Sequence, residues 1–138
     1  ECTAAQAYEH TNGRAIFACG SPFDPVVLNG RTYVPRQCNN SYIFPGVGLG
    51  VVSSRATRVT DDMFLAAAES LASLVTRSDL DQGSLYPPLA GIRDVSAQIA
   101  AAVAKVAYAQ GLATGQAPVD LRAFMGSQMY DPRYHSYV

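Results

Sequence analysis

An amphipathic stretch from Ile92 to Gln110 constrains the fold more than any other part of this sequence. Apolar side chains recur along it every three or four residues, which places them on one face of a helix. That face consists of Ile92, Val95, Ile99, Val103 and Val106, and the opposite face carries Asp94, Gln98 and Lys105. Gly111 follows and can adopt the left-handed backbone that ends helices. The stretch predicts a helix that needs other elements to cover its apolar side.

A second helix is expected from Asp61 to Val75, because Thr60 can cap it and two aspartates stand at its positive N-terminal end. Its expected buried face consists of Phe64, Ala67, Ala68, Leu71 and Leu74. The other helical segments are shorter. They are a helix capped by Thr3 that runs to about His10 and ends at Asn12-Gly13, and a last helix from Asp120 to about Ser127, followed by an extended aromatic tail from Tyr130 to Tyr137.

Two segments have strand features. Arg14 to Cys19 is apolar on both alternating faces from Ala15 onward, which is typical of a strand covered on both sides in a parallel sheet. Val26 to Val34 contains Asn29-Gly30 between two apolar runs, which predicts a hairpin with a two-residue turn. The order of elements therefore predicts an α/β fold that is helix-rich and has a few strands.

The segment from Gln37 to Ser54 is ambiguous. Pro45 would interrupt a helix, and three glycines lower helix propensity, yet glycines also permit close packing. We expect a kinked, buried helix, with a strand as the competing interpretation. Leu85 to Leu89 contains two prolines and is expected to be an extended connector.

Composition limits the classes of function. The 138 residues are 49% hydrophobic and 15% charged, which suits one compact domain with a core. The net charge is -1, Lys105 is the sole lysine, and no basic cluster exists, so we expect neither nucleic acid nor a membrane as a partner. Three scattered cysteines favour a reducing compartment, and we expect the cytoplasm, or alternatively an organelle matrix. Because the chain opens on Glu1 without an initiator Met, we expect a processed or truncated piece of a longer protein.

Two places are candidate ligand sites. Gly20-Ser21 follows the predicted strand, and ligands of open α/β sheets bind beyond the carboxyl ends of strands; a simple turn is the alternative. Asn39-Asn40 offers two neutral amides, of which one can cap a helix while the other reaches a ligand; capping alone is the alternative. Cys38 beside them is either near that ligand or a small residue in a packed turn.

No catalytic or metal-binding constellation is evident. Gly46 to Gly50 does not fit a dinucleotide fingerprint, because its third glycine comes one position early and no convincing strand precedes it. Asp61 and Asp62 are expected to stabilise a helix N-terminus, not to hold a metal. Nucleophile, base and electrophile do not occur together, so we assign no catalytic residue and no metal ligand in this chain.

Six blocks of the sequence strongly resemble the malic enzyme family, in the order that family has them. They are Glu1–Tyr8, Gly13–Phe23, Gln37–Gly46, Leu85–Leu89, Ile92–Ser96 and Ser127–Tyr130. The resemblance implies that residues 1–138 form a single piece, the C-terminal portion of a Rossmann-like, doubly wound NAD(P)-binding domain with closing helices and an extended tail.

The resemblance also implies a chemistry. The family oxidatively decarboxylates (S)-malate to pyruvate and CO2, reduces NAD or NADP, and uses a divalent metal, Mg or Mn. By motif position, Asn39 would contact malate, Asn40 would lie against the nicotinamide side of the cofactor, and Gly20 would line the cofactor crevice. The metal-binding carboxylates and the catalytic tyrosine and lysine belong to sequence upstream of this chain. Arg36 and Cys38 depart from the glycines common in the family, and a larger residue at 38 could crowd the crevice.

We therefore expect a fragment of a malic enzyme that is inactive alone and whose full-length parent forms a homo-oligomer. The alternative is a freestanding, non-catalytic helical module for binding or assembly. A third possibility is a small α/β domain whose asparagines only shape turns.

Overall fold

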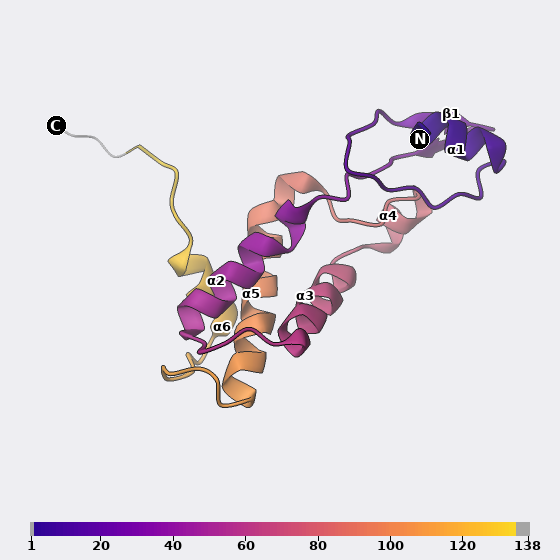
Figure 1. Cartoon of the computed structure of the whole chain (residues 1–138). Helices are drawn as coiled ribbons and strands as arrows, with labels where there is room; N and C mark the ends of the chain where they lie inside the picture. The colour runs from indigo at the N-terminus through magenta and orange to yellow at the C-terminus, as the bar shows by residue number, and fades with distance from the viewer. Residues whose placement is uncertain (1, 135–138) are drawn as a thin grey trace.

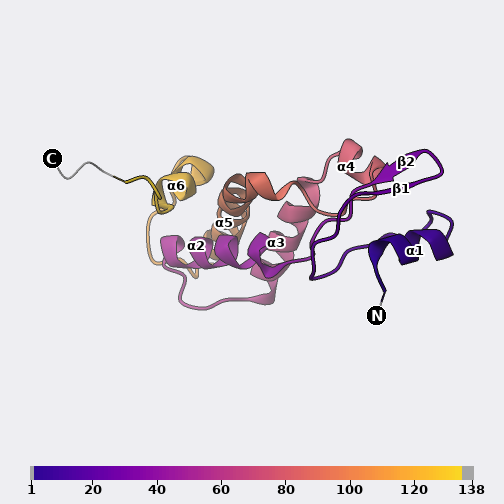
Figure 2. The same ribbon diagram turned by 90° about the horizontal axis from the view of Figure 1, so that it is seen from above.

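The computed structural model describes residues 2–134 and divides into a helical bundle and a smaller N-terminal unit (Figure 1). The bundle contains α2 (Phe44–Ser54), α3 (Asp61–Ser73), α5 (Ile92–Ala109) and α6 (Leu121–Gln128). The N-terminal unit contains α1 (Ala4–His10), β1 (Val26–Leu28) and β2 (Arg31–Tyr33), with α4 (Arg77–Asp81) beside it (Figure 2). Single 3-10 turns, η1 (Asn40–Tyr42) and η2 (Leu89–Gly91), lead into α2 and α5. Among the described residues, no helix combines the length and hydrophobicity that crossing a membrane requires.

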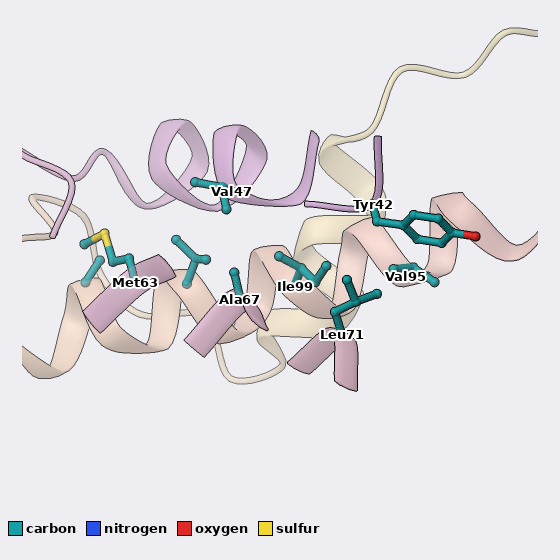
Figure 3. Packing of buried hydrophobic residues seen from close by; sticks show 9 residues of the cluster. Tyr42, Val47, Met63, Ala67, Leu71, Val95 and Ile99 are labelled. Carbon is teal, nitrogen blue, oxygen red and sulfur yellow. The ribbon is translucent and has the colours of Figure 1, made fainter. Parts of the chain in front are cut away.

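Helix α5 is the centre of the bundle, as its sequence predicts, and it contacts α2, α3 and α6. Its expected inward face is buried at Val95, Ile99 and Val103, and these residues form one cluster with side chains of α2 and α3 (Figure 3). A second face, of Ala100 and Ala104, packs against Met125 of α6. Small side chains on this second face let α6 approach, so α5 is covered on more sides than one amphipathic stripe indicates.

Helix α2 confirms the helical interpretation for residues 44–54 of the ambiguous segment, and Pro45 does not interrupt the helix. Pro45 lies in the first turn, where its missing N–H would have had no intrahelical partner. Gly46 and Gly50 face α5 directly. A Cβ atom on Gly46 would lie 2.7 Å from Cβ of Ile99, and one on Gly50 would lie 2.6 Å from the carbonyl oxygen of Ala100. The two backbones therefore approach more closely than any side chain on these positions would permit.

Helix α3 begins after Thr60 as predicted, but its buried face is rotated from the expected one. Met63, Ala67 and Leu71 are buried, whereas Phe64 is 44% exposed. The buried residues are four apart and form one ridge that packs on α5. Ala68, also expected inside, is exposed. The Thr60 hydroxyl makes no cap bond and lies 3.3 Å from Oε1 of Gln110 instead.

The N-terminal unit confirms the predictions that depend on local sequence. Thr3 and Gln6 form a capping box at the start of α1. Strands β1 and β2 pair antiparallel, and both turn residues between them, Asn29 and Gly30, have positive φ. The stacked rings of Tyr8 and Tyr33, 4.4 Å apart, join α1 to the hairpin.

The strand predicted at Arg14 to Cys19 is wrong for the described chain. Only one parallel bridge forms there, between Cys19 and Gln37. Ile16 is 74% exposed, so the segment is not covered on both sides. A parallel strand is stabilised by hydrogen-bonded neighbours, and the single bridge supplies too few of them.

The remaining expectations largely hold. Asp120 caps α6 through its side chain, and the connector from Leu85 to Pro88 has no helix or strand, with a bend at Tyr86; Leu89, expected in the connector, begins η2. The aromatic tail has no regular structure through residue 134, and the rest of it, 135–138, lies outside the described residues.

We expect Gly50→Ala to destabilise the 138-residue chain by about 1–3 kcal/mol, because the added methyl group meets backbone atoms of α5. Gly48→Ala is the matched control in the same helix. Nothing lies within 4 Å of a Cβ at Gly48, so this variant should gain up to about 1 kcal/mol from helix propensity. Urea denaturation measures both changes, and effects of the same sign would contradict the packing described here.

Candidate functional site

A cavity of about 480 Å³ lies where the turn before α2, the exposed edge of α3 and the extended connector meet. Its polar side is formed by Asn39, Asn40, Cys38 and Tyr86, and its apolar side by α3 and the start of α2. The residues that line it are Cys38, Asn39, Asn40, Tyr42, Ile43, Phe44, Ala68, Leu71, Ala72, Leu85 and Tyr86. The cavity therefore combines neutral polar groups with an apolar wall, as small-molecule sites do.

The two asparagines divide their roles at this cavity. Asn39 is the N-cap of η1, and its Oδ1 accepts a hydrogen bond of 2.9 Å from the backbone N–H of Ser41. Its amide nitrogen remains able to donate. Asn40 is exposed, and its side chain makes no hydrogen bond with the described residues. One amide oxygen thus fixes the turn, while donors of both residues are available at the cavity.

Gly20 does not line the cavity, although its loop is attached to the segment that does. The carbonyl oxygen of Gly20 accepts a hydrogen bond of 2.6 Å from Nε2 of Gln37. The backbone N–H of Cys38 donates to the carbonyl of Cys19 over 2.7 Å. The structure therefore brings Asn39 and Asn40 together at one cavity and leaves Gly20 outside its lining.

Tyr86 is a cavity residue that our sequence analysis did not single out. Its hydroxyl lies 2.9 Å from Sγ of Cys38, and its ring stacks on that of Tyr42 at 5.1 Å. The contact with Cys38, together with burial, raises the pKa of Tyr86 to about 12, so the hydroxyl stays protonated. Cys38 is exposed at the cavity, not enclosed in a packed turn. The sequence signal near Tyr86 was the Pro-Pro pair that follows it. That pair predicts a stiff connector, but it does not indicate which residues Tyr86 contacts.

An ion pair anchors the segment that leads to the asparagines. A guanidinium nitrogen of Arg36 lies 3.1 Å from Oδ1 of Asp79, and both side chains are largely buried. Oδ2 of Asp79 accepts hydrogen bonds from the hydroxyl and backbone N–H of Thr76, in the capping box of α4. The bonds from Thr76, assisted by the charge of Arg36, hold the pKa of Asp79 below its usual value against the effect of burial.

The arrangement is suited to orienting a ligand. Its amides and hydroxyl can hydrogen-bond a carboxylate or a carboxamide without adding a charge. Within residues 2–134, no three His, Cys, Asp or Glu side chains are grouped as a metal site requires. A second cavity of about 520 Å³, between α2, α6 and the loop before α6, contains none of the candidate residues.

A sequence model of the family described as "Malic enzyme, NAD binding domain" matches residues 1–108. The chain belongs to the malic enzyme family, and the expected fold class, the helix-rich part of an NAD(P)-binding α/β domain, is confirmed.

Individual relatives agree with this assignment. An NADP-dependent malic enzyme of Vitis vinifera is 57% identical over 99% of this chain and 23% of its own length. A chloroplastic NADP-dependent malic enzyme of Oryza sativa subsp. japonica is 56% identical, with 22% of its length covered. The crystal structure of a malic enzyme from Pyrococcus horikoshii Ot3 matches 69% of this chain and 20% of its own, with 32% identity and a TM-score of 0.55. The chain thus spans about a fifth to a quarter of the relatives it matches.

We expect Asp79→Asn to reduce the dependence of the unfolding free energy on pH in the acid range. The folded-state pKa of Asp79 is lowered, so its charge stabilises the folded chain above the unfolded pKa of about 4, and this contribution is lost as pH falls through the folded value. Asparagine keeps an oxygen for Thr76 but has no charge to lose. The gap in unfolding free energy between wild type and variant should therefore narrow below about pH 4.

Urea denaturation at a series of pH values measures that gap. Asp81→Asn is the control on the same helix, because its ion pair with Arg77 is exposed and contributes little at any pH. A gap for Asp79→Asn that stays constant through the acid range would contradict the role of its charge.

Proposed function

We propose that this chain supplies one wall of the active site of a malic enzyme, which converts (S)-malate and NAD(P)+ to pyruvate, CO2 and NAD(P)H. The observation that carries the proposal is the position of Asn39 and Asn40, the pair in the family motif, side by side at the rim of a cavity. The nicotinamide, when bound, accepts the hydride from malate. The residues of this chain bind malate and the nicotinamide and orient them toward each other.

The proposed roles follow from hydrogen-bonding capacity. The Asn39 oxygen is engaged by Ser41, so its amide nitrogen is the group that would donate to a malate carboxylate. Asn40, with donor and acceptor both available, suits the carboxamide of nicotinamide. Neutral amides orient these groups without competing with the charge of a metal that polarises the malate oxygens. Gly20 would shape the cofactor crevice through its loop, which is hydrogen-bonded to the segment before the asparagines.

The names of the relatives favour more specific proposals for the cofactor and the location of the enzyme. The two plant relatives described above are named NADP-dependent malic enzymes, so NADP is the proposed cofactor of the two that the sequence leaves open. The expected Mg or Mn would be held by residues other than those described here. Because one relative is chloroplastic, a plastid is proposed beside the cytoplasm as a location. Two further points stay predictions. One is that residues 1–138 form a single part of the NAD(P)-binding domain, and the other is that the full-length enzyme is a homo-oligomer.

A non-catalytic module for assembly is the second candidate. It is favoured by large apolar side chains that stay exposed, among them Ile16, Val27 and Leu65. A module would keep the fold and need no malate, so malate turnover discriminates between the two functions.

The chimeric enzyme is the test of the proposed function. The matched segment of the Vitis vinifera enzyme, 57% identical, is replaced by this chain, and absorbance of the reduced nicotinamide is followed with malate, Mn and NADP. We expect turnover by the chimera and none by the isolated 138-residue chain. A chimera that folds and assembles without turnover, or an isolated chain that turns over, would contradict the proposal.

We expect Asn39→Ala in that chimera to raise the KM for malate about tenfold or more, as loss of a hydrogen bond to a charged group implies. Alanine also removes the cap oxygen, so it lowers thermal stability as well. Asn39→Ser separates the two effects, because serine retains a cap oxygen and lacks the amide donor. If Asn39→Ser restored both stability and the KM, the residue would be a cap alone.

A further inference from the structure

Arg36 is the last charged residue before the two asparagines, and it is held in an unusual way. The side chains of Arg36 and Asp79 are 18% and 10% exposed, in a chain whose other ion pairs among described residues are mostly exposed. The pair joins positions far apart in the sequence, from the segment entering the cavity to helix α4. It is therefore a fixed link between two elements and not a mobile surface contact.

Asp79 is anchored independently of Arg36. Its other carboxylate oxygen is held by Thr76, and its backbone carbonyl accepts a hydrogen bond of 2.8 Å from Ser84. The hydroxyl of the fully buried Ser84 donates to the carbonyl of Val34 over 2.6 Å. The backbone N–H of Val34 in turn donates to Gln82 over 2.9 Å. Helix α4 and the turn after it thus form a rigid support for the chain at 34–36.

The ion pair is poorly arranged for stability alone. It has a single contact of 3.1 Å, and Nε of Arg36 is buried without a partner among the residues that the structure describes. Burying a guanidinium with an unsatisfied donor offsets much of the attraction between the charges. A buried pair of this kind can instead fix a geometry.

We propose that Arg36 is a positioning residue for Asn39, acting through its ion pair with Asp79; the inference rests on the proposed function of Asn39. Beyond Arg36, the hydrogen bonds of the chain at 37–38 to other parts of the described residues go only to the loop at Cys19 and Gly20 and to Tyr86. That loop forms no strand, so it is a weak support. The link to α4 therefore sets where the turn at Asn39 begins, while η1 and α2 set where it ends.

Backbone order in the 138-residue chain tests the positioning without any assay of activity. In Arg36→Ala, we expect 15N order parameters at Cys38 and Asn39 to fall from about 0.85 toward 0.6, with those of α5 unchanged. Arg36→Lys keeps the charge and should restore most of the order. Arg77→Ala, which removes the exposed ion pair of α4 with Asp81, is the matched control and should change nothing at 38–39.

The alternatives give distinct results. In a variant that folds, no change at 38–39, or an equal loss of order at 38–39 and in α5, would overturn the proposal. Should Arg36→Ala fail to fold, Asp79→Asn provides the same measurement, because it keeps an acceptor for Thr76 and removes the charge that holds Arg36.

Kinetics of the chimeric enzyme complete the test. We expect Arg36→Ala to raise the KM for malate several-fold with a smaller change in kcat, Arg36→Lys to recover it, and Arg77→Ala to have no effect. An unchanged KM in a folded Arg36→Ala chimera would overturn the positioning role. An inactive parent chimera would instead count against the proposed function, and the order parameters would still decide whether Arg36 fixes Asn39.

Discussion

The close approach of α2 to α5 is the constraint on which the rest of this structure depends. Gly46 and Gly50 leave no room between the helices for even a methyl group. Interiors are packed too densely to absorb such additions, so the axis of α2 is fixed relative to α5. Tyr42, just before α2, is buried and donates from its hydroxyl to the carbonyl of Pro87. The turn carrying the two asparagines therefore ends at a rigid position.

The cavity is a consequence of how three elements meet this turn. Helix α3 contributes the edge that its packing on α5 leaves exposed, and the connector contributes Tyr86. The segment at 36–38 enters from the N-terminal unit and is tied to α4. None of these elements alone forms a concave surface. The cavity presents neutral donors next to apolar walls, which suits binding and orientation and accords with a chain that spans only part of its catalytic relatives.

The candidate site was predictable to the extent that it is local. The cap at Asn39 bonds a residue two positions on, and such a bond follows from the residue type. The contact of Cys38 with Tyr86 and the ion pair of Arg36 with Asp79 join residues 48 and 43 positions apart. No periodicity or propensity indicates such pairs, because they arise only after the helices have packed. That Asn39 and Asn40 share one turn was thus accessible from the sequence, whereas the contacts that support this turn were not.

The same division applies to the fold. By itself, the sequence determined helix positions, the hairpin turn at Asn29-Gly30 and the capping residues, since hydrogen bonds and backbone sterics act over a few residues. Only the tertiary structure decided that Met63 and not Phe64 faces α5, that Arg14 to Cys19 forms no strand, and that Gly20 does not line the cavity. Each of these depends on a partner surface distant in sequence. A helix face or a parallel strand is defined by what packs against it, and that information appears only once the chain has folded.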